Sequence, residues 1–343
     1  MIHTESELEE RLSRPSDADV DALRQLDGDL LGDLLIVGAS GKMGPSLASL
    51  AQRAAEKAGV RRRVIAVARF REREARDRFE ANGIETVACD LLEPGALEKL
   101  PDAPNVIFMA ARKFGTAGAE YLSWASNTYL AGQVAERFRR SRIVAFSSGN
   151  IYPLRRLNEG GATEETLPGP VGEYAQSVLG RERMFEYVSH QYGTPVALLR
   201  LNYAIDLRYG VLLDIARVVY NRQPVDLRMG FVNVIWQGDA NSVCLRSIAH
   251  CASPPAIFNL TGPETLSVRY VAEQFGKRFG IVPEFAGVES DSALLNNAAK
   301  AHRLFGYPTV TAGELIDWTA DWLMRSGKVH NKPTHFQVRD GAF

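Results

Sequence analysis

The chain has 343 residues, 45% hydrophobic and 24% charged, which is ample for a large α/β core with room for a second lobe. Its formal net charge of −1 gives no general attraction to nucleic acid or anionic lipid, and no run approaches the roughly 18 apolar residues of a membrane span. Three cysteines without CxxC spacing, and a start without a basic-then-apolar signal segment, predict a protein of the reducing cytoplasm.

The first 32 residues are acidic and have a helical pattern. Ser6 or Thr4 can cap a helix over residues 7–12, and apolar residues recur on one face of a second helix, at Val20, Leu23, Leu26 and Leu30. We interpret residues 1–32 as an N-terminal helical extension packed on the main domain.

An apolar strand over residues 34–38 leads directly into three glycines spaced three apart, Gly38, Gly41 and Gly44. Small residues let the backbone approach a pyrophosphate, and the first N–H groups of the following helix, residues 45–57, face its negative charge. Such a match alone is weak, because an ordinary strand-to-helix turn can have the same spacing. Its position directly after a strand favours a phosphate-binding turn.

Strands and helices alternate through the rest of the first 200 residues. Two of the helices are expected over residues 124–139 and 174–192. The further strands are expected over residues 63–68, 86–89, 105–110, 142–147 and 196–201. This alternation predicts an α/β fold with a doubly wound parallel Rossmann sheet, an NAD(P)-binding domain over residues 33–200. Residues 201–343 should form mainly a smaller C-terminal substrate-binding lobe, with some segments returning to the Rossmann domain.

Several later motifs accompany the glycine turn. They are Cys89-Asp90-Leu91, residues 106–111, Asn127, residues 147–152, residues 174–178, Arg200-Leu201-Asn202 and residues 259–262. With this ordered series, residues 33–325 resemble the extended short-chain dehydrogenase/reductase superfamily, in its NAD-dependent epimerase/dehydratase group. The resemblance implies an NAD(P)-dependent oxidoreductase or epimerase that acts by hydride transfer on a sugar, sugar acid or nucleotide sugar. It also implies a homodimer formed through two long helices.

The resemblance also implies where the dinucleotide binds. The adenine ring would meet Asp90 and Leu91, although Asp90 could instead cap a helix over residues 93–100. The ribose and phosphates would lie near Ala110, Ala111 and Lys113, although Lys113 could instead be a plain surface lysine. The pyrophosphate would lie on the glycine turn, at Gly38, Ser40, Gly41, Lys42 and Met43.

Cofactor choice is read at the end of the second strand, where an NAD enzyme usually presents a carboxylate to the ribose hydroxyls. This chain has Arg69 there. A guanidinium can bind a 2′-phosphate through paired charge-assisted hydrogen bonds and gains little from an unphosphorylated ribose. We therefore expect NADP, with NAD as the alternative. Arg69 could also simply begin the solvated run of alternating Arg and Glu over residues 69–78.

The resemblance implies a proton-transfer site at Tyr174 and Ser148, with the tyrosine as proton carrier. In the family a lysine lies four residues after the tyrosine, but this chain has Val178 there. An unassisted phenol has a pKa of about 10, so another cation is needed to favour the phenolate. The candidates are Lys113, from the neighbouring strand end, and Arg181, almost two helical turns away. We favour Lys113 and assign it to the catalytic set.

Substrate contacts are expected from Ser148, Asn150, Asn202 and Tyr203, and from residues 206–219, 233–239 and 330–343. Tyr203 and Trp236 are each compatible with packing or with a platform for a sugar ring. The six histidines lack metal-ligand spacing, so no metal site is expected. The partner should be a small carbohydrate-derived molecule. An alternative from another class is a catalytically degenerate, NADP-binding regulatory or scaffold protein that lost turnover with the lysine.

Overall fold

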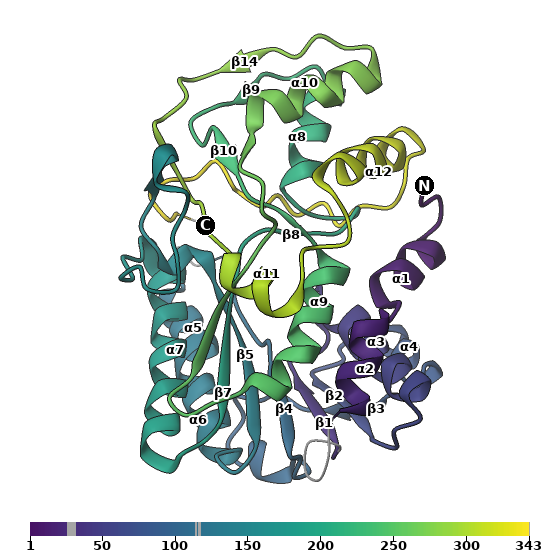
Figure 1. Ribbon diagram of the computed structural model, residues 1–343, viewed down its shortest axis with the longest axis vertical. Coiled ribbons are helices and arrows are strands. Elements are labelled where there is room, and N and C mark those ends of the chain that lie inside the picture. Colours follow the sequence, from purple (N-terminus) through teal and green to yellow (C-terminus); the bar gives the residue numbers. More distant parts are fainter. Residues whose placement is uncertain (26–31, 114, 116–117, 343) are drawn as a thin grey trace.

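The computed structural model describes residues 1–25, 32–113, 115 and 118–342. Seven parallel strands form its central sheet, in the spatial order β12-β7-β5-β4-β1-β2-β3 (Figure 1). The strands are β1 (Leu34–Val37), β2 (Val64–Ala68), β3 (Glu85–Ala88), β4 (Asn105–Phe108), β5 (Arg142–Ser148), β7 (Val196–Leu201) and β12 (Ala256–Leu260). The predicted α/β class and doubly wound parallel sheet are confirmed. The edge strand β12 was not predicted as a strand.

The central strands are apolar throughout because helices cover both faces of the sheet. Leu34 and Ile36 pack into a cluster with α3 (Gly44–Ala58) and α9 (Gln237–Arg246). Leu35 and Val37 point the other way, into a cluster with helices α6 (Leu130–Arg137) and α7 (Gly172–Tyr192). Successive residues of one strand therefore belong to two different core layers, as the two-residue period of a strand requires.

The helix expected over residues 124–139 is divided. It consists of α5 (Glu120–Trp124), a π-helical turn η3 (Ala125–Tyr129) and α6. At the centre of η3 the buried Asn127 accepts a hydrogen bond from the Arg112 backbone N–H at 2.8 Å. Its amide donates to Arg112 O and to Ser177 Oγ, each at 2.9 Å. The wider turn thus joins the β4 end to α7, and single π turns often occur beside functional sites.

The N-terminal extension forms α1 (Glu5–Ser13) and α2 (Asp17–Arg24), each with a capping box, at Thr4 and Ser16 respectively. The predicted positions Leu26 and Leu30 lie outside the described residues. Leu8 and Leu12 of α1 are buried in the core of the second lobe, whereas Leu23 of α2 is buried in the core of the sheet. The extension therefore packs on both parts of the molecule, beside α3 (Figure 1).

The second lobe lies beyond the carboxyl ends of the strands (Figure 1). Its main helices are α8 (Val211–Tyr220), α10 (Val268–Phe279) and α12 (Ala312–Met324). The short strands are paired as β8 (Ala204–Ile205) with β11 (Ile235–Trp236), β9 (Val225–Asp226) with β14 (Phe285–Ala286), β10 (Phe231–Val232) with β13 (Leu266–Ser267), and β6 (Arg155–Arg156) with β15 (Ser292–Ala293). The remaining elements are α4 (Arg73–Ala81), α11 (Ala299–Phe305), η2 (Leu97–Lys99), η4 (Gly149–Ile151), η5 (Leu157–Glu159) and η6 (Ser247–His250).

The helix expected over residues 93–100 is only the short 3₁₀ turn η2.

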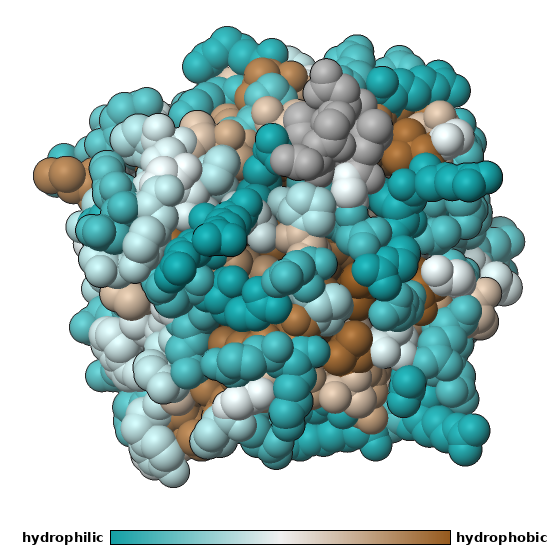
Figure 2. Space-filling model, turned by 90° about the horizontal axis from the view of Figure 1, so that it is seen from below, coloured by the Kyte–Doolittle hydropathy of each residue, from teal (hydrophilic) through white to brown (hydrophobic). Residues whose placement is uncertain are grey.

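On the face below the sheet, apolar residues reach the visible surface in small separate areas among hydrophilic ones (Figure 2). Among the described residues, no helix is both long enough and apolar enough to span a membrane.

Candidate active site

The glycine turn after β1 packs tightly against the backbone of neighbouring residues. Gly38 has a φ of +88°, and a Cβ added there would lie 2.6 Å from the backbone nitrogen of Ala110. A Cβ on Gly44 would lie 1.9 Å from Ala39 O. Side chains at these two positions would force the turn apart. Their absence lets residues 40–43 line the cavity ahead of the first turn of α3, the arrangement that accommodates a pyrophosphate.

A cavity of about 590 Å³ lies at the carboxyl edge of the sheet, between the glycine turn and the second lobe. It brings together residues that are more than 150 positions apart in the sequence. The predicted site residues that line it are Ser40, Gly41, Lys42, Met43, Ala111, Lys113, Ser148, Asn150, Tyr174, Asn202 and Tyr203. Residues from two of the expected substrate segments, 206–219 and 330–343, also line it, among them Tyr209, His330, Lys332 and Thr334.

The other predicted cofactor residues lie outside this cavity. Gly38 and Ala110 pack against each other beneath it, and Arg69 is exposed directly after β2. Leu91 is buried in the core beside α6 and α7, and the Asp90 carboxylate accepts a hydrogen bond from Leu92 N at 3.2 Å. The fold thus gives Leu91 a packing role and Asp90 a turn-capping role, and their contact with adenine stays a prediction.

Tyr174 and Ser148 meet inside the cavity. The Ser148 hydroxyl, at the end of β5, donates to Asn150 Oδ1 at 3.0 Å and shares a hydrogen bond with the Tyr174 phenol. Burial raises the pKa of Tyr174, while the positive charge of Arg181 and the hydrogen bond with Ser148 lower it in part. The net effect is a pKa above the usual value, so the phenol is held protonated at neutral pH. The pair can therefore donate a proton to a substrate oxygen.

Val178 packs against Tyr174 in a small buried cluster, so the missing lysine is replaced by apolar contact. Arg181 is buried next to the same site. Its guanidinium donates to Phe146 O at 2.8 Å and to Asn127 Oδ1 at 3.0 Å, and burial lowers its pKa to about 10. The Lys113 ammonium lies 5.7 Å from the centre of the Tyr174 ring. Both candidate cations are near. The charge of Arg181 lowers the pKa of the Tyr174 phenol, and the catalytic role assigned to Lys113 stays a prediction.

Lys42 does not point freely out of the glycine turn. Its ammonium donates to Ala204 O at 2.9 Å and lies 4.1 Å from the centre of the Tyr209 ring. Desolvation lowers the pKa of Lys42 to about 7 and that of Lys113 to about 8. The sequence named residues 206–219 only as a segment and did not single out Tyr209. Its one signal, an aromatic residue just before a glycine, is too common to be informative.

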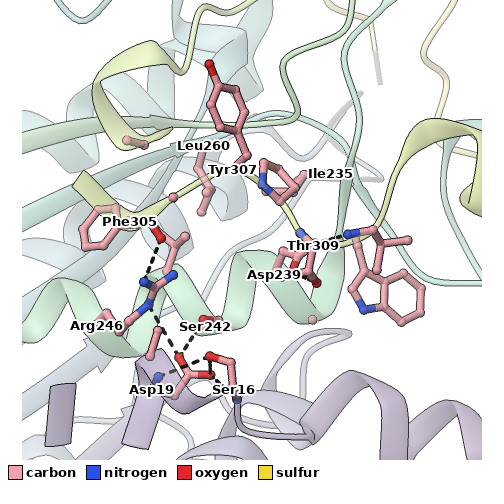
Figure 3. A pocket seen from close by; sticks show the side chains of 18 of the residues that line it. Ser16, Asp19, Ile235, Asp239, Ser242, Arg246, Leu260, Phe305, Tyr307 and Thr309 are labelled. Atoms are coloured by element: carbon pink, nitrogen blue, oxygen red, sulfur yellow. Dashed lines mark hydrogen bonds and ion pairs between the residues drawn. The ribbon is translucent and has the colours of Figure 1, made fainter. Parts of the chain in front are cut away.

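A second cavity, of about 400 Å³, lies between the N-terminal extension and α9 (Figure 3). Asp19 accepts hydrogen bonds from Ser16 Oγ at 2.7 Å and from Ser242 Oγ at 2.6 Å, and faces Arg246 Nε at 3.6 Å. We call these four residues the N-terminal clasp. Arg246 also donates to Phe305 O at 2.8 Å. The Asp19 carboxylate thus joins the extension to α9, whereas Arg246 Nε is buried without a hydrogen-bond partner among the described residues.

Residues 233–239 were expected to contact substrate, but four of them, from Ile235 to Asp239, line this second cavity instead. Trp236 is buried edge-to-face against Trp318, with ring centres 5.4 Å apart, and so has a packing role. Asp239 accepts from Thr309 Oγ1 at 2.7 Å. Within the described residues, no three His, Cys, Asp or Glu side chains gather in a way that could hold a metal ion.

The model of the NAD dependent epimerase/dehydratase family matches residues 34–205, half of the chain. The chain belongs to this family. The resemblance inferred from the motifs is thereby confirmed, and the chain is an epimerase/dehydratase-like enzyme. No curated protein matches the sequence.

Solved structures share the fold over most of the chain. UDP-glucuronic acid 4-epimerase from Bacillus cereus, in complex with UDP-glucuronic acid and NAD, has a TM-score of 0.69 and 16% identity, covering 86% of this chain and 99% of that chain. UDP-glucose 4-epimerase from Thermotoga maritima, with UDP-glucose, has a TM-score of 0.70 and 15% identity, with the same coverage. The epimerase Mth375 from Methanothermobacter thermautotrophicus has a TM-score of 0.70 and 18% identity, covering 90% and 96%. At these identities the likeness shows a common fold.

Proposed function

We propose that the protein is an NAD(P)-dependent oxidoreductase or epimerase that acts on a sugar, sugar acid or nucleotide sugar. The observation that carries this proposal is the hydrogen-bonded pair of Ser148 and Tyr174 in the same cavity as the glycine turn. Two of the proteins with this fold are 4-epimerases with UDP-glucuronic acid or UDP-glucose. A nucleotide sugar is therefore the first substrate class to test.

Each residue has a stated role in this proposal. The Tyr174 phenol gives a proton to the substrate oxygen or takes one from it, and Ser148 orients that oxygen. Arg181, which lines the cavity, stabilises the phenolate form through its charge, and Lys113 is the other candidate for this role. The raised pKa of Tyr174 favours the donor role, and hence the reduction of a carbonyl over the oxidation of an alcohol. When bound, the nicotinamide supplies the hydride chemistry. Asn150, Asn202 and Tyr203 would contact the substrate.

The residues around the glycine turn fit a dinucleotide. The turn is closely packed at Gly38 and Gly44, and the lysines Lys42 and Lys113 lie in the same cavity. We propose NADP as the preferred form because Arg69 is exposed directly after β2, where a guanidinium can bind a 2′-phosphate. The similar epimerase from Bacillus cereus was solved with NAD, which remains the alternative.

Titration calorimetry with NADPH and NADH tests this preference. The wild type should bind NADPH more tightly, and Arg69→Asp should remove the preference, because losing a hydrogen bond to a charged group costs about 1.5–3 kcal/mol. Arg78→Asp makes the same charge change on the exposed side of α4, away from the glycine turn, and should leave the preference intact. Equal affinity for the two dinucleotides in the wild type would refute the NADP assignment.

Turnover is tested by incubating the protein with UDP-glucose or UDP-glucuronic acid and either oxidised dinucleotide. Proton NMR then detects a change of configuration or oxidation in the sugar. A protein that binds dinucleotide but neither converts these sugars nor exchanges hydride with other sugars and sugar acids would favour the alternative function, a cofactor-binding regulatory or scaffold protein. Val178, in place of the expected lysine, is the observation behind that alternative.

A homodimer is part of the proposal. Large aromatic side chains are exposed on the helices outside the sheet, at Tyr121, Trp124, Tyr129 and Tyr187, and 58–70% of each of the three tyrosines is accessible. These residues lie on α5, η3 and α7, the elements through which the family resemblance implies dimerisation. Light scattering of the wild type should give a dimer mass, and Tyr187→Glu should shift it toward the monomer. A monomeric wild type would refute this part.

A further inference from the structure

The carboxyl-terminal segment crosses from the second lobe to the sheet domain. It leaves the end of α12 and reaches the start of α7 (Figure 1), and on the way some of its residues line the cavity. Arg339 Nη1 donates to Ser292 O at 2.7 Å, and Gly341 packs so closely on α7 that a Cβ on Gly172 would lie 2.5 Å from Gly341 O. We call residues 330–341 the carboxyl-terminal strap. Its last residues are held by these contacts, and its first half borders the cavity.

The strap has a definite shape over the cavity. Its backbone at His330 donates to Arg208 O at 3.0 Å. Thr334 donates to the Asp214 carboxylate from its N–H at 2.7 Å and from its hydroxyl at 2.6 Å. Between and beside these anchors, Asn331 and His335 adopt positive φ values of 51° and 55°. Non-glycine residues adopt this region at a cost, and such residues are concentrated at functional sites. Within this stretch, residues 330, 332 and 334 line the cavity.

The side chains that line this cavity carry more positive than negative charge. Three ammonium side chains line it, those of Lys42, Lys113 and Lys332. Of the nearby carboxylates, Asp206 is bound by Arg208, with contacts of 2.6 and 3.0 Å. Among the described residues, Lys332 has no carboxylate within ion-pair distance.

The nearby Asp214 carboxylate adds little to this balance. Its pKa is raised by burial, and it accepts the hydrogen bonds of Thr334. Lys332 therefore lines the same cavity as the glycine turn, as an exposed cation that no described acid neutralises. A dinucleotide pyrophosphate carries two negative charges and several acceptor oxygens, and ammonium groups bind such oxygens strongly.

We propose that the carboxyl-terminal strap binds the pyrophosphate of the dinucleotide through Lys332 and so clamps the cofactor onto the glycine turn. The inference rests on the proposed dinucleotide function, which it extends by a contact from the far end of the chain. His330 lines the same part of the cavity, where burial and the charge of Arg208 lower its pKa and keep its ring neutral. Lys332 thus supplies the charge of the strap, and the hydrogen bonds of His330 and Thr334 hold it in position.

The experiment is a calorimetric titration of the full-length protein with NADH and with NADPH, at low and at physiological ionic strength. Lys332→Ala should weaken the binding of both dinucleotides about five- to twentyfold, the effect of a partly exposed charge-assisted hydrogen bond. The loss should be larger at low salt, because screening weakens exposed charges. Lys332→Arg retains the charge and should restore most of the affinity. Lys328→Ala, which removes an exposed lysine paired with Glu5 outside the cavity, should change nothing.

The outcomes separate this inference from the function on which it rests. A wild type that binds neither dinucleotide refutes the proposed function and the clamp together. Unchanged dinucleotide affinity in Lys332→Ala refutes the clamp alone. A loss confined to the binding of UDP-glucose would also refute it, since Lys332 would then contact the substrate. Melting temperatures of all variants, measured in parallel, show whether each remains folded.

Discussion

The two cavities of this protein use charge in opposite ways. In the N-terminal clasp, the Asp19 carboxylate is bound by two serine hydroxyls and faces Arg246 (Figure 3). In the Tyr174 cavity, Lys42 and Lys113 are desolvated, with pKa values lowered to about 7 and 8. In the first arrangement, charged and polar side chains of the protein bind one another and hold the N-terminal extension on α9. The second holds positive charge that an anionic ligand would stabilise, as expected of a site built for binding.

The largest expected effect is at Tyr174. Tyr174→Phe removes the proton carrier but keeps the ring packed against Val178, so turnover should fall by at least about a thousandfold while dinucleotide affinity stays within a few-fold. The measurement is the rate of sugar conversion, with binding followed by calorimetry. Tyr187→Phe, on the exposed side of the same helix, is the control and should keep full activity. Unchanged turnover in Tyr174→Phe would show that the chemistry occurs elsewhere.

A substitution in the N-terminal clasp should lower the stability of the protein and leave dinucleotide binding unchanged. Asp19→Ala removes a buried carboxylate and leaves the half-buried Arg246 and Ser242 without this partner, which should lower the free energy of unfolding by about 2 kcal/mol. Denaturant unfolding measures this loss, and dinucleotide affinity should be unchanged. Asp21→Ala removes an exposed carboxylate from the same helix and should cost less than about 0.5 kcal/mol. A clasp variant that keeps its stability but loses cofactor binding would overturn the comparison.

The smallest expected effect is a proton taken up on binding. A pyrophosphate near Lys42 and Lys113 should raise their pKa values from about 7 and about 8. Since each bound-state pKa lies above the free-state value, binding takes up protons between the two values, and affinity falls as pH rises through that window. Calorimetry with NADH in buffers of different ionisation enthalpy measures the uptake. NADH is chosen because the 2′-phosphate of NADPH also titrates near neutral pH.

In this test Lys42→Met should reduce the uptake. The matched experiment at the other cavity uses Arg246→Met, which should leave the uptake unchanged because that charge is engaged by Asp19. Binding enthalpies that do not depend on the buffer would show that no proton is taken up. They would contradict the view that an anionic ligand raises the pKa values of Lys42 and Lys113.

The sequence by itself indicated six of the seven strands and the glycine turn. Strand runs such as residues 34–37 are apolar on both faces, and the turn needs glycine because Gly38 meets Ala110, so both leave a local pattern in the sequence. Short-range constraints of this kind can be read without coordinates. Tyr174 and Ser148 were identified through the family resemblance, and their catalytic roles stay predictions.

Only the tertiary structure decided which charges act on which groups. Arg181, seven residues from Tyr174, lies buried beside the phenol and lowers its pKa through its charge, a contact that the spacing in the sequence did not favour. Four residues of the segment 235–239 line the second cavity, and Lys332 lines the same cavity as a glycine turn almost 300 residues earlier in the chain. Electrostatic effects depend on distance through space and on desolvation, and neither quantity is encoded in sequence spacing.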